Sequence, residues 1–195
     1  MLRRFSHRNQ KGFSLVEVMV SVLVTSVSLL GMAGMQISSK RAGQEAVQRT
    51  AAAAMAMDML ERMRSNPQAI ASYATAGVGG GTIEAEPSPN CSNDTTELCT
   101  SIQLAAHDLW EWEQTIDGAT ESRIVNENTV FTGGLINPTG CITVDGGEIR
   151  ITMVWEGFEE MANPAGNTCG ANIGKYGADD EKRQIIAVST FITDE

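Results

Sequence analysis

Residues 12–17 read Gly-Phe-Ser-Leu-Val-Glu and open an apolar run that extends from Phe13 to Met35. The run carries a single charged residue, Glu17, and at about 1.5 Å per helical residue it can cross a bilayer core of roughly 30 Å. A lone charge in hydrocarbon costs about 2.5 to 3.5 kcal/mol on insertion scales, so such a charge usually has a partner. The run predicts a membrane-spanning helix that contains one acid, and this acid is expected to have a charge partner.

The position of Glu17 suggests what its partner is. A cut between Gly12 and Phe13 would create an α-amine four residues, or one helical turn, before this carboxylate. The acid could then neutralise an N-terminus, either its own or that of a neighbouring chain.

The twelve residues before the run contain four basic residues and no acid: Arg3, Arg4, Arg8 and Lys11. Basic residues next to a membrane span favour the cytoplasmic side. This distribution predicts that the N-terminal end stays in the cytoplasm and the rest faces outward, although Lys40 and Arg41 weaken the asymmetry.

An ordinary secretory signal peptide is the alternative interpretation, with residues 18–30 as its apolar region and residues 31–34 as its cleavage zone. Glu17 inside the apolar segment argues against it, as does a helical pattern that continues well beyond residue 34.

Residues 11–17, Lys-Gly-Phe-Ser-Leu-Val-Glu, resemble the class III signal of type IV prepilins and secretion pseudopilins. The resemblance implies that a prepilin peptidase cleaves after Gly12 and methylates the new amine of Phe13. Residues 30–36, 48–49 and 56–67 are similar to the minor pilins of the type IV pilus modification protein PilV family. Residues 104–112 and 149–155 resemble the same family more loosely.

The resemblance also implies a function. Proteins of this family are anchored in the bacterial inner membrane by a single span, carry their C-terminal domain in the periplasm, and assemble with other minor pilins to prime or cap the type IV pilus. The expected partners are prepilin peptidase, other minor pilins, the major pilin and inner-membrane lipid. A type II secretion pseudopilin is one alternative, and a membrane-tethered periplasmic binding module or enzyme is another.

The helix is expected to continue beyond the membrane, because no proline occurs before Pro67 and residues 36–64 are rich in helix formers. An apolar stripe should dock on a domain from Ala53 onward; its members are Ala42, Ala46, Ala53, Met57 and Leu60. The polar side chains expected on the opposite face are Arg41, Gln44, Gln48, Asp58, Glu61 and Arg62. The predicted organisation is a leader at 1–12, a span at 13–35, an amphipathic helix at 36–65 and a periplasmic domain at 66–195.

Within that domain, residues 71–90 are rich in Gly, Thr, Ser and Pro and predict a loop. A helix is predicted from Thr100 to about Ile116, because Thr100 and Gln103 have the spacing of a capping box. The apolar residues expected to face a sheet are Ile102, Ala105, Ala106, Leu109 and Trp112. We expect a solvated face to hold the possible surface pair His107 and Glu111 together with Asp108 and Glu113.

Four cysteines follow the span, at positions 91, 99, 141 and 169. An even number of cysteines in an extracytoplasmic domain favours disulfides, and four allow three pairings. We prefer Cys91 with Cys99 and Cys141 with Cys169. Zinc is the alternative, but the spacing of the first pair is wider than that of a zinc knuckle.

The remainder predicts strands. Residues 141–145, the turn Gly146-Gly147 and residues 148–156 read as a hairpin, with Ile149, Ile151, Met153 and Trp155 alternating onto a buried face and Arg150, Thr152 and Glu156 on the other. Residues 184–193 predict a last antiparallel strand after a long loop at 158–177, and residues 123–131 a further short strand. The expected fold class is α+β: a long N-terminal helix packed on a small antiparallel sheet, as in pilins.

Charge and composition argue against two classes of function, nucleic-acid binding and catalysis. The net charge is −10 and falls to −14 without the basic leader, so the body has no electrostatic footprint for nucleic acid. The chain beyond the leader has one histidine and no nucleophile elbow, HExxH motif or calcium loop. We expect a structural protein with no catalytic residue, metal site or cofactor.

Overall fold

The computed structural model describes residues 12–80, 82–83, 85–92, 98–119, 121–125, 128–131, 133–162 and 166–192. The chain divides into two compact units, Met1–Gly43 and Gln44–Glu195. Helix α1 (Leu15–Ser65) contributes to both units, and every other helix and strand belongs to the second.

Helix α1 begins and ends close to the predicted positions. The carbonyl of Ser14 accepts hydrogen bonds from the backbone N–H groups of Glu17 and Val18, at 3.0 and 3.2 Å. Ser65 ends the helix two residues before Pro67, because the residue before a proline is forced out of the α region.

The buried face of α1 in the second unit differs from the predicted one. Its buried residues are Ala52, Ala56, Met59, Leu60 and Met63. Of the predicted stripe only Leu60 is fully buried, whereas Met57 is 50% exposed and Ala42 and Ala46 are exposed. The spacing was right but the phase was wrong, because the run Ala51–Ala54 offers small apolar side chains on every face of the helix.

A four-stranded antiparallel sheet forms the second layer of this unit, in the order β1-β4-β5-β6. Its strands are β1 (Thr75–Val78), β4 (Thr139–Asp145), β5 (Glu148–Glu156) and β6 (Arg183–Phe191). The hairpin of β4 and β5 and the antiparallel pairing of β6 with β5 confirm the predicted strands. Gly146 and Gly147 both adopt positive φ, 55° and 88°, as a primed two-residue turn requires.

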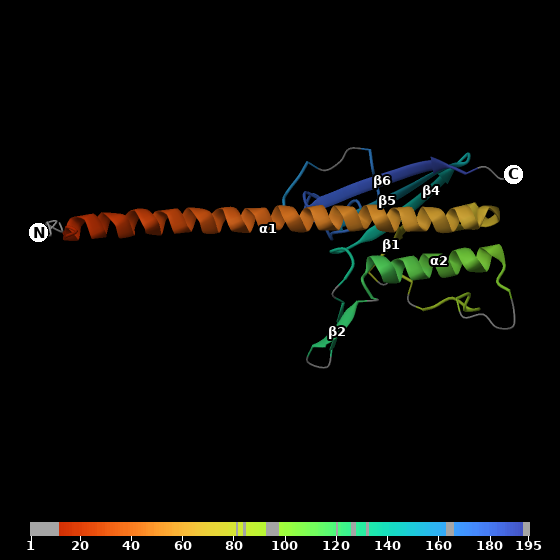
Figure 1. Cartoon of the computed structure of the whole chain (residues 1–195). Coiled ribbons are helices and arrows are strands. Elements are labelled where there is room, and N and C mark those ends of the chain that lie inside the picture. The colour runs from red at the N-terminus through yellow and green to blue at the C-terminus, as the bar shows by residue number, and fades with distance from the viewer. Residues whose placement is uncertain are drawn as a thin grey trace, which may run out of the picture. The chain divides into compact units, whose positions relative to one another are not determined.

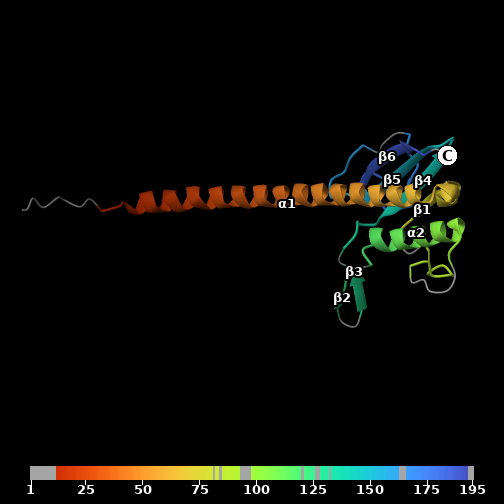
Figure 2. The same cartoon turned by 45° about the vertical axis from the view of Figure 1, so that its right-hand side comes forward.

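The core lies between this sheet and two helices, the second half of α1 and α2 (Ser101–Ile116), which run side by side (Figures 1 and 2). The buried side chains of β5 that point into it are Ile149, Ile151, Met153 and Trp155, as predicted. The long helix packed on a four-stranded antiparallel sheet is the pilin-like α+β fold that the sequence predicts.

Three parts of the chain depart from prediction. The 71–90 segment contains a strand, β1, which follows a 3₁₀ helix at Pro67–Tyr73. In place of one short strand there are two, β2 (Ser122–Val125) and β3 (Asn128–Phe131), which pair antiparallel in a separate sheet. Thr152 was expected on an exposed face but is only 5% exposed, because residues from the 158–182 region cover part of that face.

Helix α2 has the predicted cap but not the predicted faces. Thr100 and Gln103 form the reciprocal capping box. Ile102 is 67% exposed, and Ala106 is exposed as well. The buried residues of α2 are Ala105, His107, Asp108, Trp112, Glu113 and Ile116. The expectation that His107, Asp108 and Glu113 lie on a solvated face is therefore wrong.

Two disulfides join the preferred pairs of cysteines. Cys91 bonds to Cys99, and Cys141 bonds to Cys169. The second bond is buried beside Val154 and Tyr176, where it fixes the loop before β6 to strand β4.

Candidate functional site

The peptide bond between Gly12 and Phe13 lies in non-helical backbone just before α1. Phe13 is 83% exposed, and no atom lies within 4 Å of the place where a Cβ on Gly12 would stand. A protease needs accessible backbone outside a helix, and residues 12–14 are exposed and non-helical. Cleavage after Gly12 stays a prediction.

Glu17 lies in the first turn of α1, with its side chain exposed. Among the described residues its carboxylate has no ion-pair partner. The partial positive charge at a helix N-terminus stabilises an acid in the first turn. A free amine at Phe13 would add a full positive charge close to the same point.

The rest of the N-terminal unit exposes its apolar side chains. Helix α1 is long and apolar enough to cross a membrane, and none of its most apolar 18-residue window is buried. Large side chains that are at least half exposed follow one another from Leu15 to Met35: Leu15, Val16, Val18, Met19, Val20, Val22, Leu23, Val24, Val27, Leu29, Leu30, Met32 and Met35. A surface of this kind is stable only in lipid or against other apolar surfaces.

The polar side chains within this segment are compatible with an apolar environment. The hydroxyls of Ser21, Thr25, Ser26 and Ser28 each donate a hydrogen bond to the carbonyl four residues earlier, at 2.7 to 2.8 Å. An unsatisfied donor in hydrocarbon is costly, and these bonds remove that cost within the helix itself. Glu17 is left as the one charged group between Leu15 and Met35.

In the second unit, Arg62 of α1 contacts three acids, of which Asp58 is on α1 and the other two are on α2. Its guanidinium contacts Asp58 at 3.0 Å, Asp108 at 3.2 Å and Glu111 at 2.6 Å. Burial alone lowers the pKa of Arg62, but the hydrogen bonds to Glu111, Asp58 and Asp108 outweigh it and raise the pKa above its ordinary value. Arg62 is therefore a fixed positive charge at this junction.

Asp108 extends the same network toward the 3₁₀ helix. Its second oxygen accepts a hydrogen bond from the hydroxyl of Tyr73 at 2.5 Å, and that hydroxyl accepts one from Asn66 at 3.1 Å. Burial, reinforced by the bond to Asp108, raises the pKa of Tyr73 above its ordinary value. Tyr73 thus stays protonated as a structural donor.

Glu113 is fully buried and holds the loop after β1. One of its oxygens accepts hydrogen bonds from Gly79 N, Thr82 N and Thr82 Oγ1, at 2.9, 2.5 and 2.7 Å. The other accepts one from Ile83 N at 2.7 Å. Burial alone raises the pKa of Glu113, but these four bonds stabilise the charged form and lower the pKa below its usual range.

Two polar side chains of α1 also hold loops, a role that the sequence analysis did not predict for either. Glu45 accepts hydrogen bonds from the backbone N–H groups of Phe158 and Glu159, both at 3.1 Å. Gln48 donates to the carbonyl of Gly134 at 3.4 Å and accepts from Ile136 N at 3.2 Å. These contacts bring together residues 86 to 114 positions apart, so no local pattern could have predicted them.

These side chains are occupied in structural bonds. Within the described part of the chain, no group of three or more His, Cys, Asp or Glu residues could hold a metal ion. The structure joins the four cysteines in pairs, whereas Gly12, Phe13 and Glu17 belong to the N-terminal unit. The exposed apolar segment of α1 and its one acid, Glu17, are thus the features that point to binding of lipid or another protein.

Comparison with protein families gives two matches. Residues 34–110 match the family model described as Type IV pilin Tt1218, and residues 7–33 match the prokaryotic N-terminal methylation motif. No curated protein and no solved structure matches the chain.

Proposed function

We propose that this type IV pilin-like protein, which carries an N-terminal methylation motif, is a PilV-like minor pilin that acts in type IV pilus assembly. Its place would be in the complex that primes the filament or remains at its tip. Proteins of this class are structural and not enzymes. The matched motif implies processing by prepilin peptidase, and the apolar helix is consistent with inner-membrane anchoring before assembly.

The observation that supports the proposal most is the exposed apolar segment of α1 with its single acid near the N-terminus. In the membrane, lipid covers such a segment, and in a filament the corresponding segments of other subunits would cover it. Cleavage after Gly12 would place the amine of Phe13 one turn from Glu17. An ion pair between Glu17 and the amine of another subunit would then hold the chains together where water is excluded.

The second unit is suited to a periplasmic domain in such an assembly. Two disulfides cross-link it, as expected in an oxidising compartment. Acids of this unit, such as Asp108 and Glu113, bind side chains and loops of the same unit. We infer one membrane span at 13–35, an amphipathic continuation at 36–65 and a periplasmic domain at 66–195.

The test is deletion of the gene followed by imaging of surface pili and measurement of type II secretion in the same strain. We expect loss or strong reduction of pili with normal secretion, and recovery when the wild-type gene is supplied. Loss of secretion with normal pili would instead identify a pseudopilin, and normal pili with normal secretion would contradict any role in assembly.

A further inference from the structure

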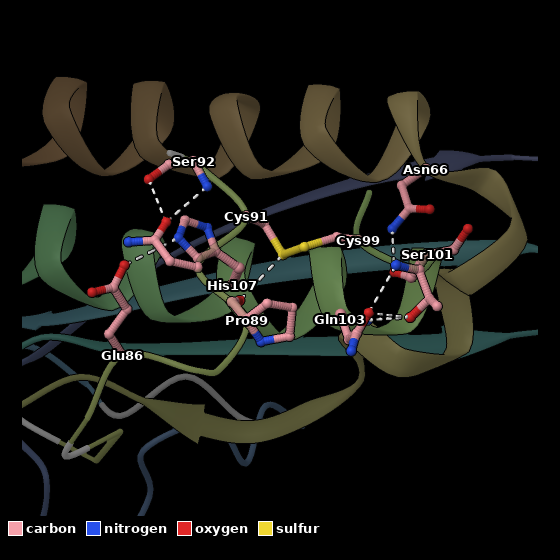
Figure 3. The surroundings of a disulfide bond; sticks show 11 residues. Asn66, Glu86, Pro89, Cys91, Ser92, Cys99, Ser101, Gln103 and His107 are labelled. Carbon is pink, nitrogen blue, oxygen red and sulfur yellow. Dashed lines mark hydrogen bonds and ion pairs between the residues drawn. A yellow bond between two sulfur atoms is a disulfide. The ribbon is translucent and has the colours of Figure 1, made fainter. Parts of the chain in front are cut away.

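His107 is a buried histidine whose ring lacks one hydrogen bond. The residue is 2% exposed, and its Nε2 atom has no hydrogen-bond partner among the described residues. Oε1 of Glu86 lies 3.5 Å from this nitrogen. Figure 3 shows the two side chains directed toward each other near the Cys91–Cys99 disulfide. A buried nitrogen that faces a carboxylate without a hydrogen bond can gain one by binding a proton.

We propose that Glu86 and His107 form a proton-dependent clasp that holds the segment 85–92, here called the clasp segment, against helix α2. A neutral imidazole has one N–H donor and one lone pair, so Nε2 either presents a lone pair to the negative oxygen of Glu86 or donates an uncharged hydrogen bond to it. The imidazolium formed by taking a proton from solvent donates from both nitrogens and carries a positive charge. Protonation therefore turns this contact into a charge-assisted hydrogen bond.

The surroundings of His107 stabilise the ion pair between its imidazolium and the carboxylate of Glu86. The ring of Trp110 lies with its centroid 5.7 Å from that of His107, within reach of a cation–π interaction. Because His107 is buried, water screens the attraction between the imidazolium and Glu86 only weakly.

The other charged groups near this part of α2 are already engaged. Asp108 accepts a hydrogen bond from the hydroxyl of Tyr73 and pairs with Arg62, and Glu111 pairs with the same guanidinium. Arg62 is thus neutralised by acids of α1 and α2. Within the described part of the clasp segment, Glu86 is the one ionisable side chain. His107 therefore has its charge partner in Glu86.

The disulfide gives the clasp a fixed end. Cys91 belongs to the clasp segment, and Cys99 directly precedes Thr100, the residue that caps α2. The segment is thus tied covalently to the start of α2 at one end, while the contact of Glu86 with His107 holds it further along. Cys91 and Cys99 are half-buried. When the contact is lost, the segment can move away from α2 and expose more of the Cys91–Cys99 bond to reagents in solution.

The experiment measures the rate at which a phosphine reductant opens Cys91–Cys99 in the full-length protein in detergent micelles. Histidine changes its charge between about pH 5 and pH 8, so rates are compared at about pH 5.5 and about pH 8. Trapping the free thiols and mapping the peptides reports each disulfide separately. The buried Cys141–Cys169 bond, with both residues less than 8% exposed, serves as an internal reference for the reagent.

Relative to this reference, we expect wild-type Cys91–Cys99 to be reduced about two to five times more slowly at the lower pH. A ratio of this size corresponds to a weak ion pair between Glu86 and the protonated His107. Glu86→Gln, at a side chain that is 37% exposed, should fold normally and lose the pH effect. His107→Gln should lose it as well, whereas Asp145→Asn, which removes an exposed acid of the β4–β5 hairpin, should keep it. A rate ratio that does not depend on pH in wild type, or that survives in Glu86→Gln, would overturn the clasp.

Discussion

The indole Nε1–H of Trp112, on α2, donates a hydrogen bond to the backbone carbonyl of Met55, on α1, at 3.0 Å. The far edge of the same ring lies over Gly140 of β4, where a Cβ would overlap the ring carbons. One side chain therefore joins both helices and the sheet, and its position depends on a glycine far away in the sequence.

Gly140→Ala should destabilise the second unit. The new methyl group would push Trp112 out of place, and overpacking of a core typically costs about 1 to 3 kcal/mol of the free energy of unfolding. Urea unfolding followed by tryptophan fluorescence measures the loss. Gly43→Ala is the control, because its Cβ meets no atom within 4 Å, and it should leave this transition unchanged or raise its midpoint slightly, since alanine favours a helix over glycine. Equal stability of Gly140→Ala and wild type would show that the ring can move aside at no cost.

Glu113 should make the stability of the domain depend on acid. Its pKa in the folded protein is lowered, so its contribution is fully present above the unfolded value of about 4.3 and is lost as the pH falls through the folded value. Wild type should therefore lose more stability between about pH 5 and pH 3 than Glu113→Gln, which cannot ionise.

At neutral pH, Glu113→Gln should unfold more easily by about 1 to 3 kcal/mol, because the amide group meets backbone donors that it cannot accept from. Unfolding curves at several pH values measure both effects. If the free energy of unfolding changed with pH in the same way in both proteins, the four hydrogen bonds would not depend on the charge of Glu113.

The two disulfides should contribute unequally. They close loops with sequence separations of 28 and 8 residues. The chain-entropy relation gives about 3.5 kcal/mol for the longer loop and about 2.5 kcal/mol for the shorter one. Replacing Cys141 and Cys169 together by alanine should lower the unfolding midpoint more than the same change at Cys91 and Cys99. The reverse order would show that strain or residual structure, and not loop length, decides.

Processing is predicted to begin the mature chain at Phe13. Mass spectrometry of the protein from membranes should find N-methylated Phe13 as its first residue. Gly12→Val should accumulate as unprocessed precursor, since a branched side chain obstructs the backbone that the peptidase must bind. Gly31→Ala, inside α1 and equally open to solvent, is the control and should be processed normally. A mature protein that starts at Met1 or after residue 30 would refute the assignment.

Glu17 is predicted to act in assembly and not in membrane insertion or cleavage. Glu17→Ala should still be processed and should remain in the membrane, because a charge in hydrocarbon has been removed. It should fail to co-purify with other pilins and fail to support piliation. Glu17→Gln keeps the shape of the side chain and separates charge pairing from hydrogen bonding. Normal piliation by both variants would exclude the ion pair.

Local sequence signals predicted a large part of the fold. The Thr100 and Gln103 cap fixed the start of α2, and Gly146-Gly147 fixed the turn between β4 and β5. Strand β1 was missed because it has four residues and no apolar alternation, and it gains its conformation by pairing with β4. Propensity within the 71–90 segment could not reveal a partner strand more than 60 residues away.

The polar interior was missed for the same physical reason. Asp108 and Glu113 are acids, which usually face solvent on a helix, and they are buried because Arg62, Tyr73 and the backbone of Gly79, Thr82 and Ile83 satisfy them. Their partners lie 30 to 46 residues away along the chain. By contrast, the features of Gly12, Phe13 and Glu17 are local, so sequence alone could propose roles for them.

The hydroxyls that bond within the apolar segment of α1 also bear on how such helices could meet. Ser21, Thr25, Ser26 and Ser28 use their protons on their own helix, so between Leu15 and Met35 they offer a neighbour no strong lateral attachment. Apolar flanks of this kind slide and rotate past one another at little cost. In the filament that we propose, the axial register of the subunit would then depend on a single point, the carboxylate of Glu17, and that contact alone would correct a shift of one helical turn.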